Sequence, residues 1–417
     1  MRKRFNPWLL LFFTLILTGS SLLQTEEIQE RARFFTRPLE FDFTRWTLQA
    51  IWTKWEQRAV GGAAFLPPES RTQVVLDYHV RLEAAHSAEN ALQEALADPS
   101  QAHNAAELGD LRARLNALKA QRDALAPWAE SVLETQVGEV LSKAGLTLGG
   151  QPIPPVLFHI TQPPQALIVS PRQVIRQDAD ISILPDLSPE AVQTLETQVA
   201  SAFDVSTLVV GIGGVGVYPT MVLESGDVNW LSEVIAHEWI HNYLSWHPLG
   251  ALYNSTPEMR TINETTASLA GKALGQMVIA ANYPALQAAP APPPAPPATD
   301  APSAPPAFDF QHEMHHTRVV VDALLAAGKT KRAEWYMEVR RRYFWENGYH
   351  LRKLNQAYFA FYGAYADAPA GAAGEDPVGA AVRALWTASD GDAGRFVHRM
   401  AWVWSYEHLQ ALLNGGG

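Results

Sequence analysis

The chain has 417 residues, enough for two or three domains with sizeable cores. Its formal net charge is −11, which argues against nucleic acid as the main partner, because phosphate contacts need a basic surface. There is no cysteine, which excludes disulfides, thiolate metal sites and cysteine nucleophiles.

The N-terminus joins a basic cluster to an apolar stretch. Residues 2–4 are all basic, and residues 5–25 carry no charge. This pattern is typical of a signal peptide or of a membrane anchor whose basic end stays in the cytoplasm. We expect residues 1–25 to be a retained anchor that leaves the catalytic region outside the cytoplasm, with secretion after signal cleavage as the alternative.

Residues 26–148 are expected to be a helical region. Residues 26–68 hold several tryptophans and many charges, and predict a short amphipathic stretch that lies near a membrane surface or packs against the catalytic domain. Residues 70–145 are rich in strong helix formers. A break at residues 98–100 predicts two long antiparallel helices, the second of which Pro127 should kink or divide.

Residues 149–280 change in character. Two short apolar runs at residues 154–160 and 165–170 are separated by Pro-Pro turns, and predict strands. Ser188 followed by Pro189 predicts the start of a helix that runs to about Phe203.

A glycine-rich run follows this helix. Residues 211–216 read GIGGVG and match the GxGxxG pattern, which binds a dinucleotide only where a helix begins at the glycines. The next residues, 217–222, predict a strand with a proline, so we expect no nucleotide. We predict an edge strand whose glycines let an extended substrate approach closely.

Residues 237–241 read HEWIH, the HExxH pattern. Residues four apart lie on one face of a helix, so His237 and His241 can aim both rings at one point. Two neutral nitrogen ligands suit zinc, and Glu238 lies beside them to take a proton from a water held there. Asp227 or Asn229 can cap the start of this helix.

A zinc site of this type needs a third protein ligand, usually from a following helix. Residues 261–271 read TINETTASLAG and predict a small-residue helix that can pack closely against the first, with Glu264 as the third ligand. HExxH followed some twenty residues later by Asn-Glu-x-x-Ala resembles the gluzincin metallopeptidases, the thermolysin and aminopeptidase group. The resemblance covers about residues 209–271.

The resemblance implies roles for four residues. His237, His241 and Glu264 would bind zinc, and Glu238 would act as the general base. The chain departs from the thermolysin-like pattern at Ser268, where that group has an aspartate that orients a histidine. The partners that orient these two histidines are therefore not identified by the resemblance.

Two other patterns compete with this assignment. His247 lies six residues after His241, the metzincin spacing, but Leu244 replaces the glycine that must break the helix there. A second HExxH spans residues 312–316, directly after a Pro/Ala-rich segment, and no Asn-Glu-x-x-Ala segment follows it. We expect a histidine-rich helix start or an adventitious metal site, with contact between one of its histidines and the first site as an alternative.

The remainder of the chain is expected to be an insertion and a helical region. Residues 281–307 are rich in proline and alanine, and predict a disordered insertion, whereas residues 308–417 predict helices. Tyr349, His350 and Tyr358 are candidates, by residue type alone, for stabilising an oxyanion, although packing in the core is the simpler interpretation.

Together these patterns predict an α+β fold that is predominantly α-helical. A zincin-like core at residues 149–280, with a small sheet before the active-site helix, is accompanied by the helical hairpin and C-terminal helices. The predicted function is zinc-dependent hydrolysis of a peptide or protein substrate, with the choice between endopeptidase and aminopeptidase open. The alternative is a non-catalytic, membrane-associated envelope scaffold or binding protein, against which the intact Glu238 argues.

Overall fold

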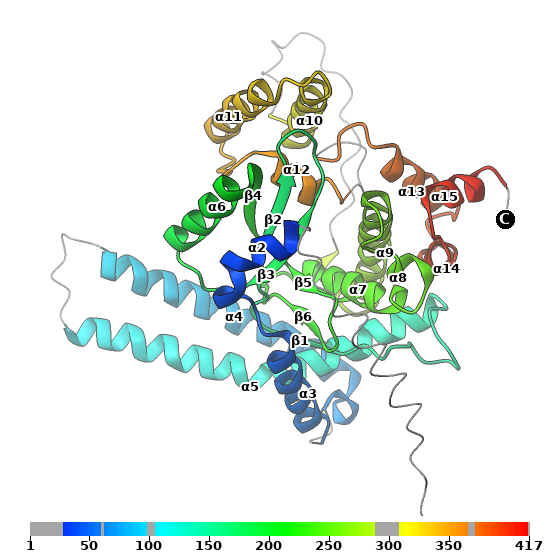
Figure 1. Cartoon of the computed structure of the whole chain (residues 1–417). Helices are drawn as coiled ribbons and strands as arrows, with labels where there is room; N and C mark the ends of the chain where they lie inside the picture. The colour runs from blue at the N-terminus through cyan, green and yellow to red at the C-terminus, as the bar shows by residue number, and fades with distance from the viewer. Residues whose placement is uncertain (1–27, 60–61, 98–104, 288–307, 366–371, 416–417) are drawn as a thin grey trace, which may run out of the picture.

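The computed structural model describes residues 28–59, 62–97, 105–287, 308–365 and 372–415. Over these residues the protein is α+β and predominantly helical, as predicted (Figure 1). The predicted anchor at residues 1–25 and most of the Pro/Ala-rich insertion lie outside the described residues. Among the helices described, none is both long and apolar enough to cross a membrane.

The predicted helical hairpin is present and forms the longest element pair in Figure 1. It consists of α4 (Pro68–Ala97) and α5 (Ala105–Lys143). Pro127 lies inside α5 and does not divide it, and the helix beyond the proline buries Val132 and Leu133 fully in the core. The preceding segments are α2 (Ile28–Thr36), η1 (Arg37–Leu39), α3 (Phe43–Ala59) and η2 (Gly62–Phe65).

Two small sheets precede the central helices. In the first sheet, β2 (Gln165–Pro171) pairs antiparallel with both β3 (Ala179–Ile183) and β4 (Val205–Gly211). In the second sheet, β6 pairs in parallel with β1 and antiparallel with β5. The bounds of these three strands are β1 (Phe158–Ile160), β5 (Gly214–Val215) and β6 (Thr220–Val222).

The helix between β3 and β4 follows its sequence signals. The side chain of Ser188 accepts a hydrogen bond from the Ala191 N–H, and Asp204 ends the helix in the left-handed region at φ 53°. Helix α6 (Pro189–Phe203) therefore has the predicted start and end.

Two helices at the centre of the molecule carry the HExxH and Asn-Glu-x-x-Ala segments. They are α7 (Val228–Leu244) and α9 (Pro257–Asn282), joined through α8 (Pro248–Ala251). The carboxylate of Asp227 accepts hydrogen bonds from the first backbone N–H groups of α7, which identifies Asp227 as the cap. Helix α9 continues into the predicted insertion, and η3 (Pro284–Leu286) follows it.

The C-terminal helices cover both sides of the central pair. Their bounds are α10 (Phe310–Ala326), α11 (Thr330–Glu346), α12 (Gln356–Tyr362), α13 (Pro377–Thr387), α14 (Ala393–Ala401) and α15 (Tyr406–Leu413). Helices α10, α11 and α12 share one apolar core with the first sheet, including Ile168 and Phe359. Helices α13 and α14 join the main core around α7, α9 and the hairpin, which includes Leu274 and Val382.

Candidate metal centre

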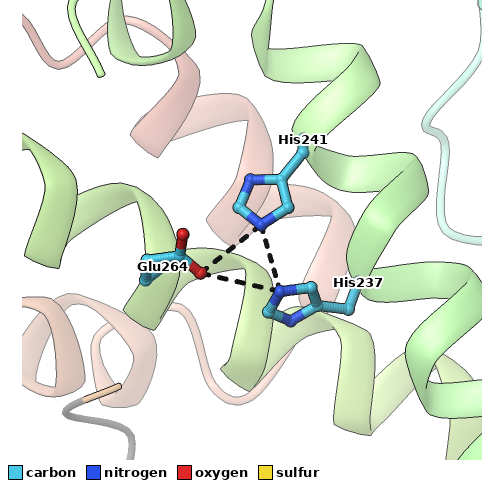
Figure 2. A group of neighbouring side chains, drawn as sticks. All are labelled: His237, His241 and Glu264. Carbon is cyan, nitrogen blue, oxygen red and sulfur yellow. Dashed lines mark hydrogen bonds and ion pairs between the residues drawn. The ribbon is translucent and has the colours of Figure 1, made fainter. Parts of the chain in front are cut away.

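Three side chains from α7 and α9 converge at one point (Figure 2). The Nε2 atoms of His237 and His241 lie 3.0 Å apart. The Oε2 atom of Glu264 lies 3.7 Å from the first nitrogen and 3.5 Å from the second. In the described part of the chain, no other group of three or more His, Asp or Glu side chains has its ligand atoms gathered this closely.

Close packing of α7 on α9 brings these side chains together. A Cβ atom at Gly271 would lie 2.9 Å from the Cα of His237, and one at Gly275 would lie 2.8 Å from the Cα of Glu233. Any residue larger than glycine would therefore push the helices apart at these two positions. The expected small-residue helix is confirmed, and its glycines set the distance between Glu264 and the histidines.

The spacing and chemistry of the three groups fit a tetrahedral zinc ion. With zinc–ligand bonds near 2.05 Å and tetrahedral angles, ligand atoms lie about 3.3 Å apart, within the range of the three separations here. The Oε2 atom of Glu264 is buried and makes no hydrogen bond to any described residue. A buried carboxylate oxygen that faces two imidazole nitrogens and makes no hydrogen bond of its own is suited to bind a cation.

The charges of the cluster are strongly coupled. Burial favours the neutral form of His241, but the carboxylate of Glu264 outweighs this and raises the His241 pKa to about 9. Burial also disfavours charge on Glu264, yet His241 holds the pKa of that carboxyl well below its usual range. Burial and the neighbouring His241 lower the pKa of His237 to about 3. Without metal, these shifts favour a proton on His241 over one on His237 or Glu264.

Both histidines have partners that fix their orientation. The Oδ1 atom of Asn263 accepts a hydrogen bond from Nδ1 of His241 at 2.8 Å, and the amide of Asn263 donates to the Leu249 carbonyl at 3.2 Å. The backbone carbonyl of Ala267 accepts a hydrogen bond from the His237 ring. These partners hold the two rings so that both Nε2 atoms point toward Glu264.

Glu238 lies beside the three converging groups. Its side chain is buried, and burial raises its pKa to about 7. A Cβ atom at Gly214 would lie 2.7 Å from the Cγ of Glu238, and one at Gly216 would lie 3.1 Å from the Cβ of His241. The glycines of the predicted edge strand therefore make room for these two side chains.

No protein-family model, curated protein or solved structure matches this chain. The function is therefore inferred from the residues of this site and their surroundings.

The rival ligand His247 lies apart from the cluster. It stands at the start of α8, its Nδ1 donates to the Tyr243 carbonyl at 2.9 Å, and its ring packs 5.5 Å from that of Trp402. The unbroken course of α7 through Leu244 carries His247 away from His241, as the missing glycine predicts.

The second HExxH lies on α10 and brings no metal-binding group together. His312 and His316 are exposed, Glu313 pairs with Arg340, and His315 lies 3.4 Å from Glu375. The carboxylate of Glu313 is thus already paired with the guanidinium of Arg340 on α11. The segment is a histidine-rich helix start, as expected, and none of its histidines joins the first cluster.

The sequence-based oxyanion candidates lie elsewhere. The Tyr349 ring stacks on Phe310 at 4.5 Å, and the His350 ring lies 4.2 Å from Trp345. Tyr358 is buried in the core that α12 shares with the first sheet. Packing in the core is therefore confirmed for Tyr358 alone, because Tyr349 and His350 are exposed and only stack on neighbouring rings.

Sequence reasoning missed two tyrosines at the site. The ring of Tyr365 stacks on that of His237, with centroids 6.4 Å apart. The hydroxyl of Tyr253 donates to Oε1 of Glu264. Burial, then the charge of Glu264, raises the pKa of both hydroxyls well above the usual range, so both stay protonated donors.

The site opens into a cavity of about 1440 Å³. Its walls come from β3, β5, α7, α9 and the segment that follows α12. This volume exceeds the roughly 300–1,000 Å³ of typical small-molecule pockets, so the cavity has room for several residues of a peptide.

Proposed function

We propose that the protein is a zinc-dependent peptidase with a zincin-like core. One observation carries this proposal. His237, His241 and Glu264 converge at the ligand spacing of zinc, and the buried carboxylate of Glu238 lies beside them at the wall of a large cavity. The cluster thus combines three ligands, which would leave a fourth zinc position for water, with a group able to move a proton.

When bound, zinc supplies a Lewis acid that polarises the scissile carbonyl and promotes ionisation of the attacking water. Glu238 has a pKa near 7, so it can accept the proton of that water and then donate it to the leaving amine. Tyr365, protonated and stacked on His237, can donate a hydrogen bond to the developing oxyanion. Asn263 and Tyr253 hold two of the ligands in place.

The substrate is proposed to be a peptide or protein segment. The cavity has the volume for an extended chain, and Gly214 and Val215 of β5 line it next to Glu238. In keeping with the pattern of residues 1–25, we also propose that the chain is anchored to a membrane with this region outside the cytoplasm.

The test is metal content of the purified full-length protein after reconstitution with zinc. We expect about one zinc per chain in the wild type and none in Glu264→Ala. The control His312→Ala changes an exposed histidine of the second HExxH and should keep its zinc. Zinc in Glu264→Ala, or none in the wild type, would overturn the site.

Activity is tested separately with a peptide library and Glu238→Gln. The substitution removes the proton acceptor but keeps the shape, so we expect zinc to remain and hydrolysis to fall at least about 100-fold. If the wild type binds zinc but shows no hydrolysis that Glu238→Gln abolishes, the result would instead support the alternative of a non-catalytic envelope protein.

A further inference from the structure

The face of helix α3 that packs against α5 carries a buried charge, that of Lys54. Lys54 is almost fully buried, and its Nζ lies 2.6 Å from Glu130 and 2.9 Å from Glu134, both on α5. Ala50 is buried one turn earlier on the same face. This face is fixed by a network of charges, so the helix cannot rotate to bury its other side.

The opposite face of α3 is apolar and exposed. Leu48, Ile51, Trp52 and Trp55 are 65, 39, 65 and 72% exposed, at the i, i+3, i+4, i+7 spacing of one helical stripe. At 100° per residue, the centre of this α3 stripe lies roughly 130° around the helix from the midpoint of Ala50 and Lys54. A helix in water normally has the reverse arrangement, with its apolar stripe inward.

The exposed apolar area is large for a free surface. Phe65, in η2 beside α3, is 79% exposed. An aromatic side chain presents about 150–250 Å², so Phe65 and the two tryptophans together leave on the order of 400 Å² uncovered. Leu48 and Ile51 extend this area, which reaches the range of patches that mark interaction sites.

The charges around the α3 stripe favour a lipid surface. Arg45 and Arg58 are exposed and flank the stripe on its two sides, although the whole chain is acidic. Glu56, the one acidic residue of α3, accepts a hydrogen bond from the Trp52 indole at 2.7 Å. Tryptophans between flanking arginines match the composition of a membrane interface, where rings enter the headgroup layer and guanidinium groups reach phosphates.

We propose that the α3 stripe is a docking surface for an anionic lipid bilayer. The uncharged stretch of residues 5–25 lies only eighteen residues before the first residue of α3, so a bilayer that holds this stretch would be within reach of the stripe. This proposal does not depend on the peptidase activity. It assigns α3 as the part of the folded region that rests on the membrane.

The absence of native cysteine allows a direct test in the full chain. The variant Trp52→Cys places an environment-sensitive fluorophore in the stripe. The matched control Trp335→Cys labels a tryptophan of equal exposure, 65%, on α11, at the opposite end of the molecule (Figure 1). Both proteins are reconstituted with vesicles of phosphatidylcholine and phosphatidylglycerol, some of whose lipids carry a nitroxide quencher.

We expect the nitroxide lipid to quench the label at residue 52 several-fold more strongly than the label at residue 335. We also expect the label at residue 52, and not the control, to be protected from quenching by aqueous iodide. Equal iodide access at both positions would overturn the proposal. So would protection at residue 52 without lipid quenching, which would mean that protein covers the stripe. Disulfide cross-linking of unlabelled Trp52→Cys chains would then identify a second copy as the cover, and its absence would point to residues of the same chain.

Discussion

A single methyl group between α7 and α9 should weaken zinc binding. In Gly271→Ala, the new Cβ would meet the Cα and Cβ of His237 at 2.9 Å and its backbone nitrogen at 3.0 Å. Non-bonded carbon atoms pack at about 3.5–4.0 Å, so the helices have to separate by about 0.6–1 Å at this position. The contacts are with backbone, which cannot move aside as a flexible side chain could.

This separation acts directly on the ligand set. The Nε2 of His237 and the Oε2 of Glu264 are already 3.7 Å apart, and the shift would take them beyond the about 3.3 Å of a tetrahedral site. We expect zinc affinity to fall at least tenfold, or about 1.4 kcal/mol. The metal-free protein should lose only about 0–2 kcal/mol, because overpacking costs about 1–3 kcal/mol and alanine gains about 1 kcal/mol over glycine in a helix.

Zinc affinity is measured by competition with a chromophoric chelator, and the stability of the metal-free protein by urea unfolding. The control is Gly109→Ala on α5, where no atom lies within 4 Å of the new Cβ. It should bind zinc like the wild type and be as stable or slightly more stable. Wild-type zinc affinity in Gly271→Ala would refute the claim that the glycine sets the ligand spacing.

Four further outcomes are expected. Because Glu264 raises the pKa of His241 to about 9 despite its burial, zinc must displace a proton, and affinity should rise about tenfold per unit from pH 7 to 9. The same raised pKa stabilises the metal-free protein below the ordinary value near 6.5, so its unfolding free energy should fall as pH rises from 6.5 to 9, and a flat urea-unfolding profile would contradict the ion pair. Asn263→Ala should lose about 10–100-fold in zinc affinity in chelator competition, whereas unchanged affinity would mean that His241 needs no partner. Tyr365→Phe should keep zinc but lower kcat about 100–1,000-fold in a peptide assay, and an unchanged kcat would exclude it as the oxyanion donor.

Elements with strong local signals were predictable from the sequence. Ser188 and Asp227 cap α6 and α7 as their side chains predict, since a cap depends only on the next few residues. Strand β3 was missed, because its five residues include Asp180 and Ser182 and carry little strand preference of their own. It exists through pairing with β2, a partner that the sequence does not reveal.

The same distinction applies to the site. One turn of α7 carries His237, Glu238 and His241, so their arrangement follows from that helix alone. Predicting Glu264 as their partner required the resemblance and the small residues of α9. Tyr365 had no such signal. Its position depends on distant residues of α9: Arg260 donates to the Ala360 carbonyl, and Thr265 donates to the Ala364 carbonyl.

The two HExxH segments differ in the helix that each one faces. Both lie on regular helices with capped starts, so the pattern fixes the histidine spacing equally well in each. Helix α9 presents glycines and the carboxylate of Glu264 to α7, and this carboxylate faces both histidines of the pattern. Helix α11 instead presents Arg340 to α10, where it neutralises Glu313 and repels any metal ion. The two HExxH segments therefore differ in the charge and size of the residues on the facing helix, and these residues are what a search for metal sites at such segments should examine.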